Sequence, residues 1–212
     1  MIYIENIFLC IAVPMLLSLP FFGRRQRSMT LFILLGMGMC LLSAYVNSFF
    51  MAYFDVSPRS AAVEITPVCE EILKLLPTLL YYLIFEPDKR ELPQGAIAVS
   101  MGFATFENIC FLTENGARDI FYMLVRGISA GALHILCGVI IGYGIAYVFR
   151  RRYLALTGAM GLLGACIVFH AIYNLLITAG GVWKSAGYFF PAALLLCLYA
   201  VRRILPRFLP RQ

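Results

Sequence analysis

Long apolar stretches follow one another along this chain, and short segments that hold most of the charge separate them. An apolar run of about 20 residues is long enough for a helix to cross the hydrocarbon core of a bilayer. Seven runs approach or exceed that length, over approximately residues 2–22, 30–53, 61–85, 94–114, 119–149, 153–178 and 186–205. The pattern predicts an all-α fold: a polytopic membrane bundle of about seven transmembrane helices that forms a single integral membrane domain over residues 1–212.

Composition agrees with this prediction. The chain is 62% hydrophobic and 13% charged, with a mean hydropathy of +0.86. Soluble domains hold roughly 45–50% apolar and about 25% charged residues. The net charge of +6 could indicate nucleic-acid binding, but the positions of the basic residues indicate a membrane topology instead.

Most basic residues fall in alternate predicted loops: Arg24, Arg25, Arg27, Lys89, Arg90, Arg150, Arg151, Arg152, Arg202, Arg203, Arg207 and Arg211. The other loops hold only Arg59, Arg118, Arg126 and Lys184. Because cytoplasmic loops carry the excess of lysine and arginine, this asymmetry places the N-terminus outside and the C-terminus in the cytoplasm. The basic loops are therefore expected to contact anionic lipids, and no nucleic-acid partner is expected.

The third apolar run is interrupted by charge, in Val68-Cys69-Glu70-Glu71-Ile72-Leu73-Lys74. A charged side chain at the centre of a membrane helix costs roughly 2.5–3.5 kcal/mol on insertion scales, so such residues usually have a function. Further polar residues inside the predicted helices include Glu107, Asn108, His134, His170 and Asn174, and the chain has only these two histidines.

Counting inward from the predicted helix ends, at 1.5 Å per residue, places these groups at a similar depth in the outer half of the bilayer. We therefore expect four helices, over about residues 61–178, to form a catalytic core, with the helices at 2–22, 30–53 and 186–205 flanking it. Lys74 lies four residues after Glu70 and three after Glu71, so it can pair with either carboxylate. The two successive glutamates point about 100° apart, so one is expected to face a cavity while the other orients a partner.

Four motifs occur in order along these helices: Glu70-Glu71-x-x-Lys74, Gly102-Phe103-Ala104-Thr105-Phe106-Glu107-Asn108, His134 followed by Gly142-Tyr143-Gly144, and His170-Ala171-Ile172-Tyr173-Asn174. Together they resemble the PrsW family of intramembrane proteases. That family is similar to the CAAX prenyl proteases, the bacteriocin-processing membrane proteases and the APH-1 subunit of γ-secretase. The resemblance implies a multi-pass protease of the bacterial plasma membrane that cleaves single-span membrane proteins, such as anti-sigma factors, on the extracytoplasmic side.

The leading mechanism is hydrolysis by an activated water. One carboxylate of Glu70 or Glu71 would act as general base, helped by His134. His170 and Asn174 would hold the oxyanion. Glu107 would orient an imidazole or the water, and Lys74 would form a structural ion pair. No cofactor is expected in this mechanism.

The alternative mechanism uses zinc, because carboxylates and imidazoles are zinc ligands. The candidate ligands are Glu70, Glu71, Glu107, His134 and His170. Three other functions stay open: a proton-coupled transporter, a channel, or a non-catalytic membrane scaffold. Transporters usually show internal repeats, which this sequence does not display.

Overall fold

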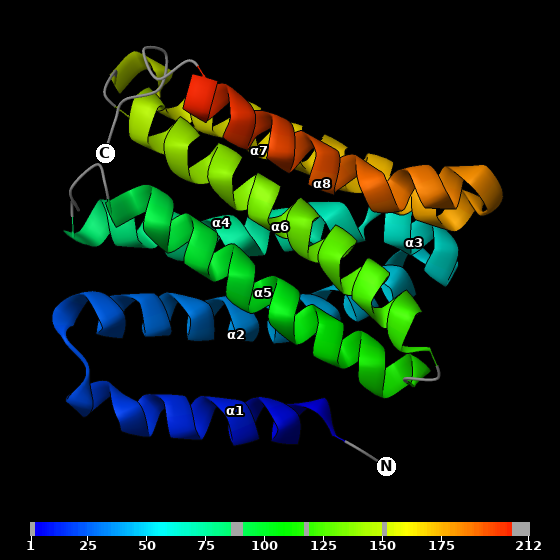
Figure 1. The fold of residues 1–212 in the computed structure, drawn as a ribbon, viewed down its shortest axis with the longest axis horizontal. Coiled ribbons are helices and arrows are strands. Elements are labelled where there is room, and N and C mark those ends of the chain that lie inside the picture. The colour runs from blue at the N-terminus through cyan, green and yellow to red at the C-terminus, as the bar shows by residue number, and fades with distance from the viewer. Residues whose placement is uncertain (1–2, 86–90, 117–118, 150–151, 205–212) are drawn as a thin grey trace.

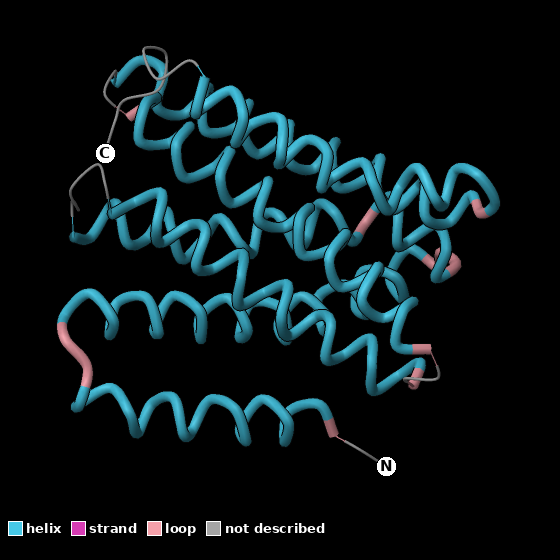
Figure 2. The backbone as a smooth tube through the Cα atoms, viewed as in Figure 1, coloured by secondary structure: helices cyan, strands magenta, loops and turns pink. Residues whose placement is uncertain are grey.

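The computed structural model describes residues 3–85, 91–116, 119–149 and 152–204. Every regular element in this part of the chain is a helix, and no strand occurs in it (Figure 2). The elements are α1 (Ile4–Ser18), the short 3-10 helix η1 (Leu19–Phe21), α2 (Arg24–Phe54), α3 (Pro58–Glu64), α4 (Thr66–Phe85), α5 (Glu91–Asn115), α6 (Ile120–Val148), α7 (Arg152–Ala179) and α8 (Gly181–Ile204).

The long helices lie lengthwise beside one another and alternate in direction (Figure 1). The connection from α1 to α2 and the start of α5 lie at one end of the bundle. The connections that follow α2 and α7 lie at the other end. The first turns of α2 and α8 therefore lie at opposite ends of the molecule.

Within the described residues, six helices are long and apolar enough to cross a membrane: Ile4–Phe21, Arg24–Tyr53, Glu91–Glu114, Ile120–Val148, Tyr153–Ala179 and Gly181–Val201. The predicted all-helical membrane bundle is thereby confirmed. Several of these helices begin earlier than the apolar runs indicate, because their polar first turns are also helical. The helix α4 is not among the six; it carries Glu70, Glu71 and Lys74.

The apolar run predicted as one helix over residues 61–85 is divided between two helices, α3 and α4, which are separated by Ile65. Pro58 begins α3, where Ser57 accepts a hydrogen bond from the Ser60 N–H as an N-cap. Pro67 lies at the start of α4. Proline lacks an N–H and suits the first turn of a helix, so these residues explain why two helices begin here.

Close packing of α2, α5 and α6 positions the site helices. A Cβ atom added to Gly36 on α2 would collide with the carbonyl oxygen of Val99, and one added to Gly102 on α5 would collide with that of Ile33. Between α5 and α6, a Cβ on Gly142 would lie 2.7 Å from the Cα of Pro93. Glycine at these positions lets helix backbones approach directly, as small residues do in membrane bundles.

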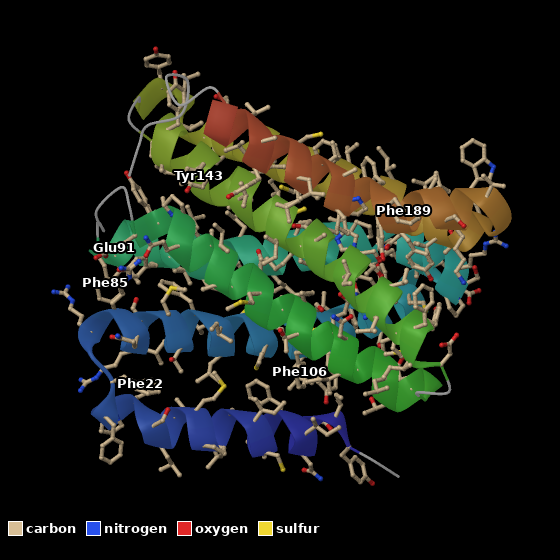
Figure 3. The ribbon with its side chains drawn as sticks, viewed as in Figure 1. Phe22, Phe85, Glu91, Phe106, Tyr143 and Phe189 are labelled. Atoms are coloured by element: carbon tan, nitrogen blue, oxygen red, sulfur yellow. The ribbon has the colours of Figure 1, made fainter. Side chains whose placement is uncertain are left out.

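Large apolar side chains cover much of the outside of the bundle. Phe189 on α8, labelled in Figure 3, is 74% exposed. Phe106 on α5 is instead fully buried, and its ring meets the ring of Phe8 of α1 edge-on at 5.6 Å between centroids. This inside–outside distribution is the one expected where lipid, not water, is the surrounding medium.

Candidate active site

Six of the seven predicted site residues come together inside the bundle. Helix α4 contributes Glu70, Glu71 and Lys74, α5 contributes Glu107, α6 contributes His134, and α7 contributes His170. All are buried except Glu107, whose side chain is 27% exposed. Because the two histidine rings meet edge-on at 5.3 Å between centroids, the four helices share one polar centre.

Glu71 is held from two sides. Its Oε1 atom lies 2.6 Å from Lys74 Nζ and 2.8 Å from His170 Nδ1. A carboxylate has no proton to donate. Nδ1 of His170 therefore carries the proton and donates a hydrogen bond to Glu71. In the neutral imidazole the other nitrogen, Nε2, then carries the lone pair. Glu71 therefore determines which nitrogen of His170 is available as an acceptor or ligand.

His134 is also held from two sides. Its Nδ1 lies 2.8 Å from Lys74 Nζ, and its Nε2 lies 2.6 Å from Glu107 Oε2. An ammonium group can only donate, so Nδ1 accepts from Lys74 and Nε2 donates to Glu107. Lys74 thus bridges Glu71 and His134, while its Nζ also lies 5.2 Å from the centre of the Phe103 ring.

Glu70 differs from its neighbour. Its Oε2 atom is buried and has no hydrogen-bond partner among the described residues. That oxygen lies 3.8 Å from His170 Nε2, the nitrogen that carries the lone pair. Two acceptors thus face one another in a buried site, which favours a cation or a hydrogen-bond donor between them. Of the acid pair, Glu70 is therefore the candidate for the chemistry of the site.

The donor set also fits a divalent metal. Glu70, His134 and His170 each offer a ligand atom, and these atoms all lie within 4.8 Å of one another. Two histidines and one carboxylate form a ligand set of catalytic zinc sites, which keep the fourth position for water or substrate. Both nitrogens of His134 already have partners, so a metal bound to His134 would replace either Lys74 or Glu107. Glu71 and Glu107 contact the histidines, as the outer partners of metal-bound imidazoles usually do.

Asn174 lies one turn beyond His170 on α7, but its amide takes part in a different contact. Its Nδ2 donates to the backbone carbonyl of Ala62 at 2.7 Å. This bond joins α3 to α7 and lies outside the chain of contacts that links the glutamates and histidines.

In the sequence Arg126 groups with the basic residues of the loops, but in the structure it belongs to the site. It lies inside α6, where its Nη2 is 2.8 Å from Glu107 Oε1, and it also donates to Asn108. Its guanidinium stacks 4.1 Å from the centre of the Phe111 ring. The signal for this role was present, because an arginine within an apolar run needs an acidic partner.

A helical membrane bundle with buried carboxylates, two histidines and a zinc-type ligand set defines a polytopic membrane protein with a hydrolase-type centre. A protein-family model described as PrsW family intramembrane metalloprotease matches residues 25–201. The chain belongs to this family, as its four motifs predicted, and it is a multi-pass membrane protein of bacterial type.

Two relatives carry the name Protease PrsW. The protein of Geobacillus kaustophilus (strain HTA426) is 27% identical over 152 residues, which cover 69% of this chain and 64% of the relative. The protein of Bacillus subtilis (strain 168) is 31% identical over 110 residues, or 50% of this chain and 47% of the relative. The chain thus covers less than two thirds of the length of either relative. No solved structure matches.

Proposed function

We propose that this chain is a membrane-embedded protease that hydrolyses peptide bonds of single-span membrane proteins, with anti-sigma factors as the substrate class. The observation that carries the proposal is the pair formed by Glu70 Oε2 and His170 Nε2, two acceptors 3.8 Å apart in a buried site. A peptidase needs such a place to hold either a water or a Lewis acid next to the scissile bond.

The two glutamates have different tasks in this proposal. Glu70 faces the reacting groups, while Glu71 directs the lone pair of His170 toward them through its bond to Nδ1. Lys74 balances the charge of Glu71 and holds Nδ1 of His134. Glu107 holds the other nitrogen of His134. Preorganised groups of this kind need little rearrangement during reaction, which is the usual source of electrostatic catalysis.

The family description favours the metal-dependent alternative. Glu70, His134 and His170 would hold the ion, and zinc is the ion whose preferences their donor set matches. When bound, the metal would supply a Lewis acid for the carbonyl and for water. Asn174 is directed to Ala62, so we assign it the role of fixing α3 beside the site, in place of the oxyanion role expected from the sequence.

We also propose that α4 crosses the membrane as a seventh span. Its charged side chains Glu70, Glu71 and Lys74 are buried against the bundle, whereas Leu80 and Leu83 on its outside are 53% and 60% exposed. The lipid-facing side of α4 is therefore apolar despite its three charges. Phe85 ends α4 and Glu91 begins α5 at the same end of the bundle, as labelled in Figure 3.

With seven spans the two termini lie on opposite sides of a bacterial plasma membrane, and the distribution of basic residues favours an outer N-terminus and a cytoplasmic C-terminus. The basic loops would then lie at the cytoplasmic surface, where they can contact anionic lipids. The chain forms a single membrane domain over residues 1–212 in this proposal, with its catalytic core at about 61–178.

Cleavage of a co-expressed single-span membrane protein tests the assignment. We expect Glu70→Gln to lower cleavage by about 10²–10⁴-fold, as for loss of an acid–base group. Glu71→Gln should lower it by about 10–100-fold, because Glu71 acts through His170. Glu64→Gln, an exposed glutamate on the neighbouring α3, is the matched control and should cleave normally. If immunoblots show equal substrate shortening by all four proteins, the site assignment is wrong.

Metal analysis of the purified protein tests the second part of the proposal. Elemental analysis should find zinc in the wild type and in Glu64→Gln, and much less of it in Glu70→Gln and His170→Ala. Chelation should abolish cleavage, and added zinc should restore it. Full cleavage by protein shown to be free of metal would exclude the metal-dependent mechanism and leave the activated-water mechanism.

A further inference from the structure

A small polar cavity lies behind the active-site ion pair, within the interior of the bundle. Its volume is about 10 Å³, and its polar lining comprises Glu71, Lys74, Thr78, Ser100 and Cys137. A cavity of this volume has room for about one water molecule, provided that two to four polar groups face it. The lining therefore meets both conditions for a hydration site.

Thr78 gives the first independent indication of a ligand. Threonines within helices usually donate to a backbone carbonyl three or four residues earlier. Thr105 and Thr178 do so here, with Met101 and Asn174. The hydroxyl of Thr78 is buried and has no hydrogen-bond partner among the described residues. A buried hydroxyl without a partner is unfavourable, so this side chain calls for a partner that is not part of the protein.

Lys74 gives the second indication. Its ammonium group has three N–H donors, and Glu71 and His134 accept two of the three. The positive charge of Lys74 at the cavity excludes a cation as the ligand. A ligand that accepts from Lys74 and donates to a hydroxyl matches the chemistry of water.

Ser100 and Gly138 complete the cavity from the side of α5 and α6. Ser100 is buried, and a Cβ atom added to Gly138 would lie 2.5 Å from its Oγ. A side chain at position 138 would therefore fill this space. The glycine keeps the cavity open next to the serine hydroxyl.

We infer that this cavity binds one ordered water, which accepts a hydrogen bond from Lys74 Nζ and donates to Thr78 Oγ1 and Ser100 Oγ. Such a water makes three hydrogen bonds, the usual number for a buried water. It joins α4 to α5 and restrains the ammonium group of Lys74, whose other two N–H groups orient Glu71 and His134. The site goes beyond the proposed proteolysis, and the water does not contact the substrate.

Thermal unfolding of the purified full chain in detergent tests this inference, because the direction in which Thr78→Val shifts Tm depends on whether the water is bound. If the Thr78 hydroxyl binds water, Thr78→Val should lower Tm by roughly 2–4 °C, the shift expected for loss of about one hydrogen bond in a chain of this length. Thr78→Ser, which keeps the hydroxyl, should retain most of the stability. Thr105→Val is the matched control for the change from threonine to valine, and it should shift Tm less.

The opposite sign would overturn the inference. If the hydroxyl has no partner, Thr78→Val removes a buried polar group, and Tm should rise or stay unchanged.

A structure at a resolution that shows ordered water gives the second test. It should contain a solvent peak within hydrogen-bond distance of Thr78 Oγ1, Ser100 Oγ and Lys74 Nζ, and the peak should disappear in the double variant Thr78→Val/Ser100→Ala. A wild-type structure without this peak would also overturn it. Because neither readout involves cleavage, failure of the proposed protease function would leave these results interpretable.

Discussion

At the scale of single residues, the site depends on how hydrogen-bond partners are divided between two adjacent glutamates. Glu71 has Lys74 and His170 as partners, whereas Glu70 Oε2 has none in the described part of the chain. The two carboxylates are chemically identical, so their difference comes only from the direction in which α4 presents each of them. This difference is the basis of the proposal that Glu71 supports the site while Glu70 takes part in the reaction.

The buried pair of Lys74 and Glu71 predicts strongly non-additive effects on stability. Lys74→Met should destabilise the protein by about 3–5 kcal/mol, because it leaves a buried carboxylate without its cation. The double variant Lys74→Met/Glu71→Gln removes both charges and should recover a large part of that loss. Chemical unfolding of all variants in detergent measures the coupling, for which about 0.5–3 kcal/mol is typical of residues in contact. If the losses in free energy of unfolding of the two single variants add up to that of the double variant, the two groups are not paired.

Arg126 is predicted to act on the site through Glu107. Arg126→Gln should lower zinc affinity and cleavage by about 10–100-fold, as for other outer partners of metal-binding histidines. Arg126→Lys keeps the charge but loses the forked geometry, so it should restore only part of both. Asn108→Ala removes the hydrogen bond between Arg126 and Asn108 and leaves Glu107 in place, so it should have a small effect. Unchanged zinc affinity in Arg126→Gln would contradict this role.

At the scale of elements, the crossing of α2 and α5 determines where Glu107 lies. The two helices touch through their backbones at Gly36 and Gly102. Phe103, the next residue, is fully buried and lies near both Lys74 and His134. Any displacement of α5 at this crossing would therefore move a wall of the site.

Substitution of the crossing glycine is predicted to destabilise the bundle. Gly102→Ala should cost about 3 kcal/mol, toward the upper end for overpacking, because the new methyl group meets a backbone carbonyl that cannot rotate away. Gly161→Ala on α7 is the matched control, since a Cβ there meets nothing within 4 Å. It should be neutral or stabilise the helix by up to about 1 kcal/mol. The two unfolding midpoints in detergent decide the prediction, and equal midpoints would show that the crossing is not tight.

At the scale of the whole molecule, the ends of the bundle differ in charge. The arginines at the start of α2 lie at the end where α5 begins, and the connections that follow α2 and α7 lie at the opposite end (Figure 1). If α4 crosses the membrane, this arrangement gives a consistent topology with the basic end in the cytoplasm. Its buried charges make α4 the span whose crossing needs the most direct test.

Reporter fusions on the two sides of α4 provide that test. Alkaline phosphatase, which is active only outside the cytoplasm, should be active when fused after Val56 and inactive when fused after Phe85. A fusion after Gly116 should again be active, because α5 crosses in the opposite direction. Equal activity after Val56 and Phe85 would mean that α4 does not span the membrane, and the topology would then have six spans.

The sequence by itself determined the class of fold and the family, and it selected most residues of the candidate site. Hydrophobicity is a property of each stretch of chain, so long apolar runs predict membrane helices without knowledge of their neighbours. Charged and imidazole groups within those runs are conspicuous for the same reason, which is why Glu70, Glu71, Glu107, His134 and His170 could be selected.

The tertiary structure alone decided which hydrogen-bond partner each of those residues has. It showed that Glu70 Oε2 lacks a hydrogen-bond partner among the described residues while Glu71 Oε1 has two. It also showed that Arg126 contacts Glu107 and that Asn174 is directed to Ala62. It also showed two helices where one apolar run was continuous. Partners depend on the rotation of each helix and on the distance between helix axes, and both are set by contacts between residues far apart in the chain. No pattern within a single apolar run contains that information.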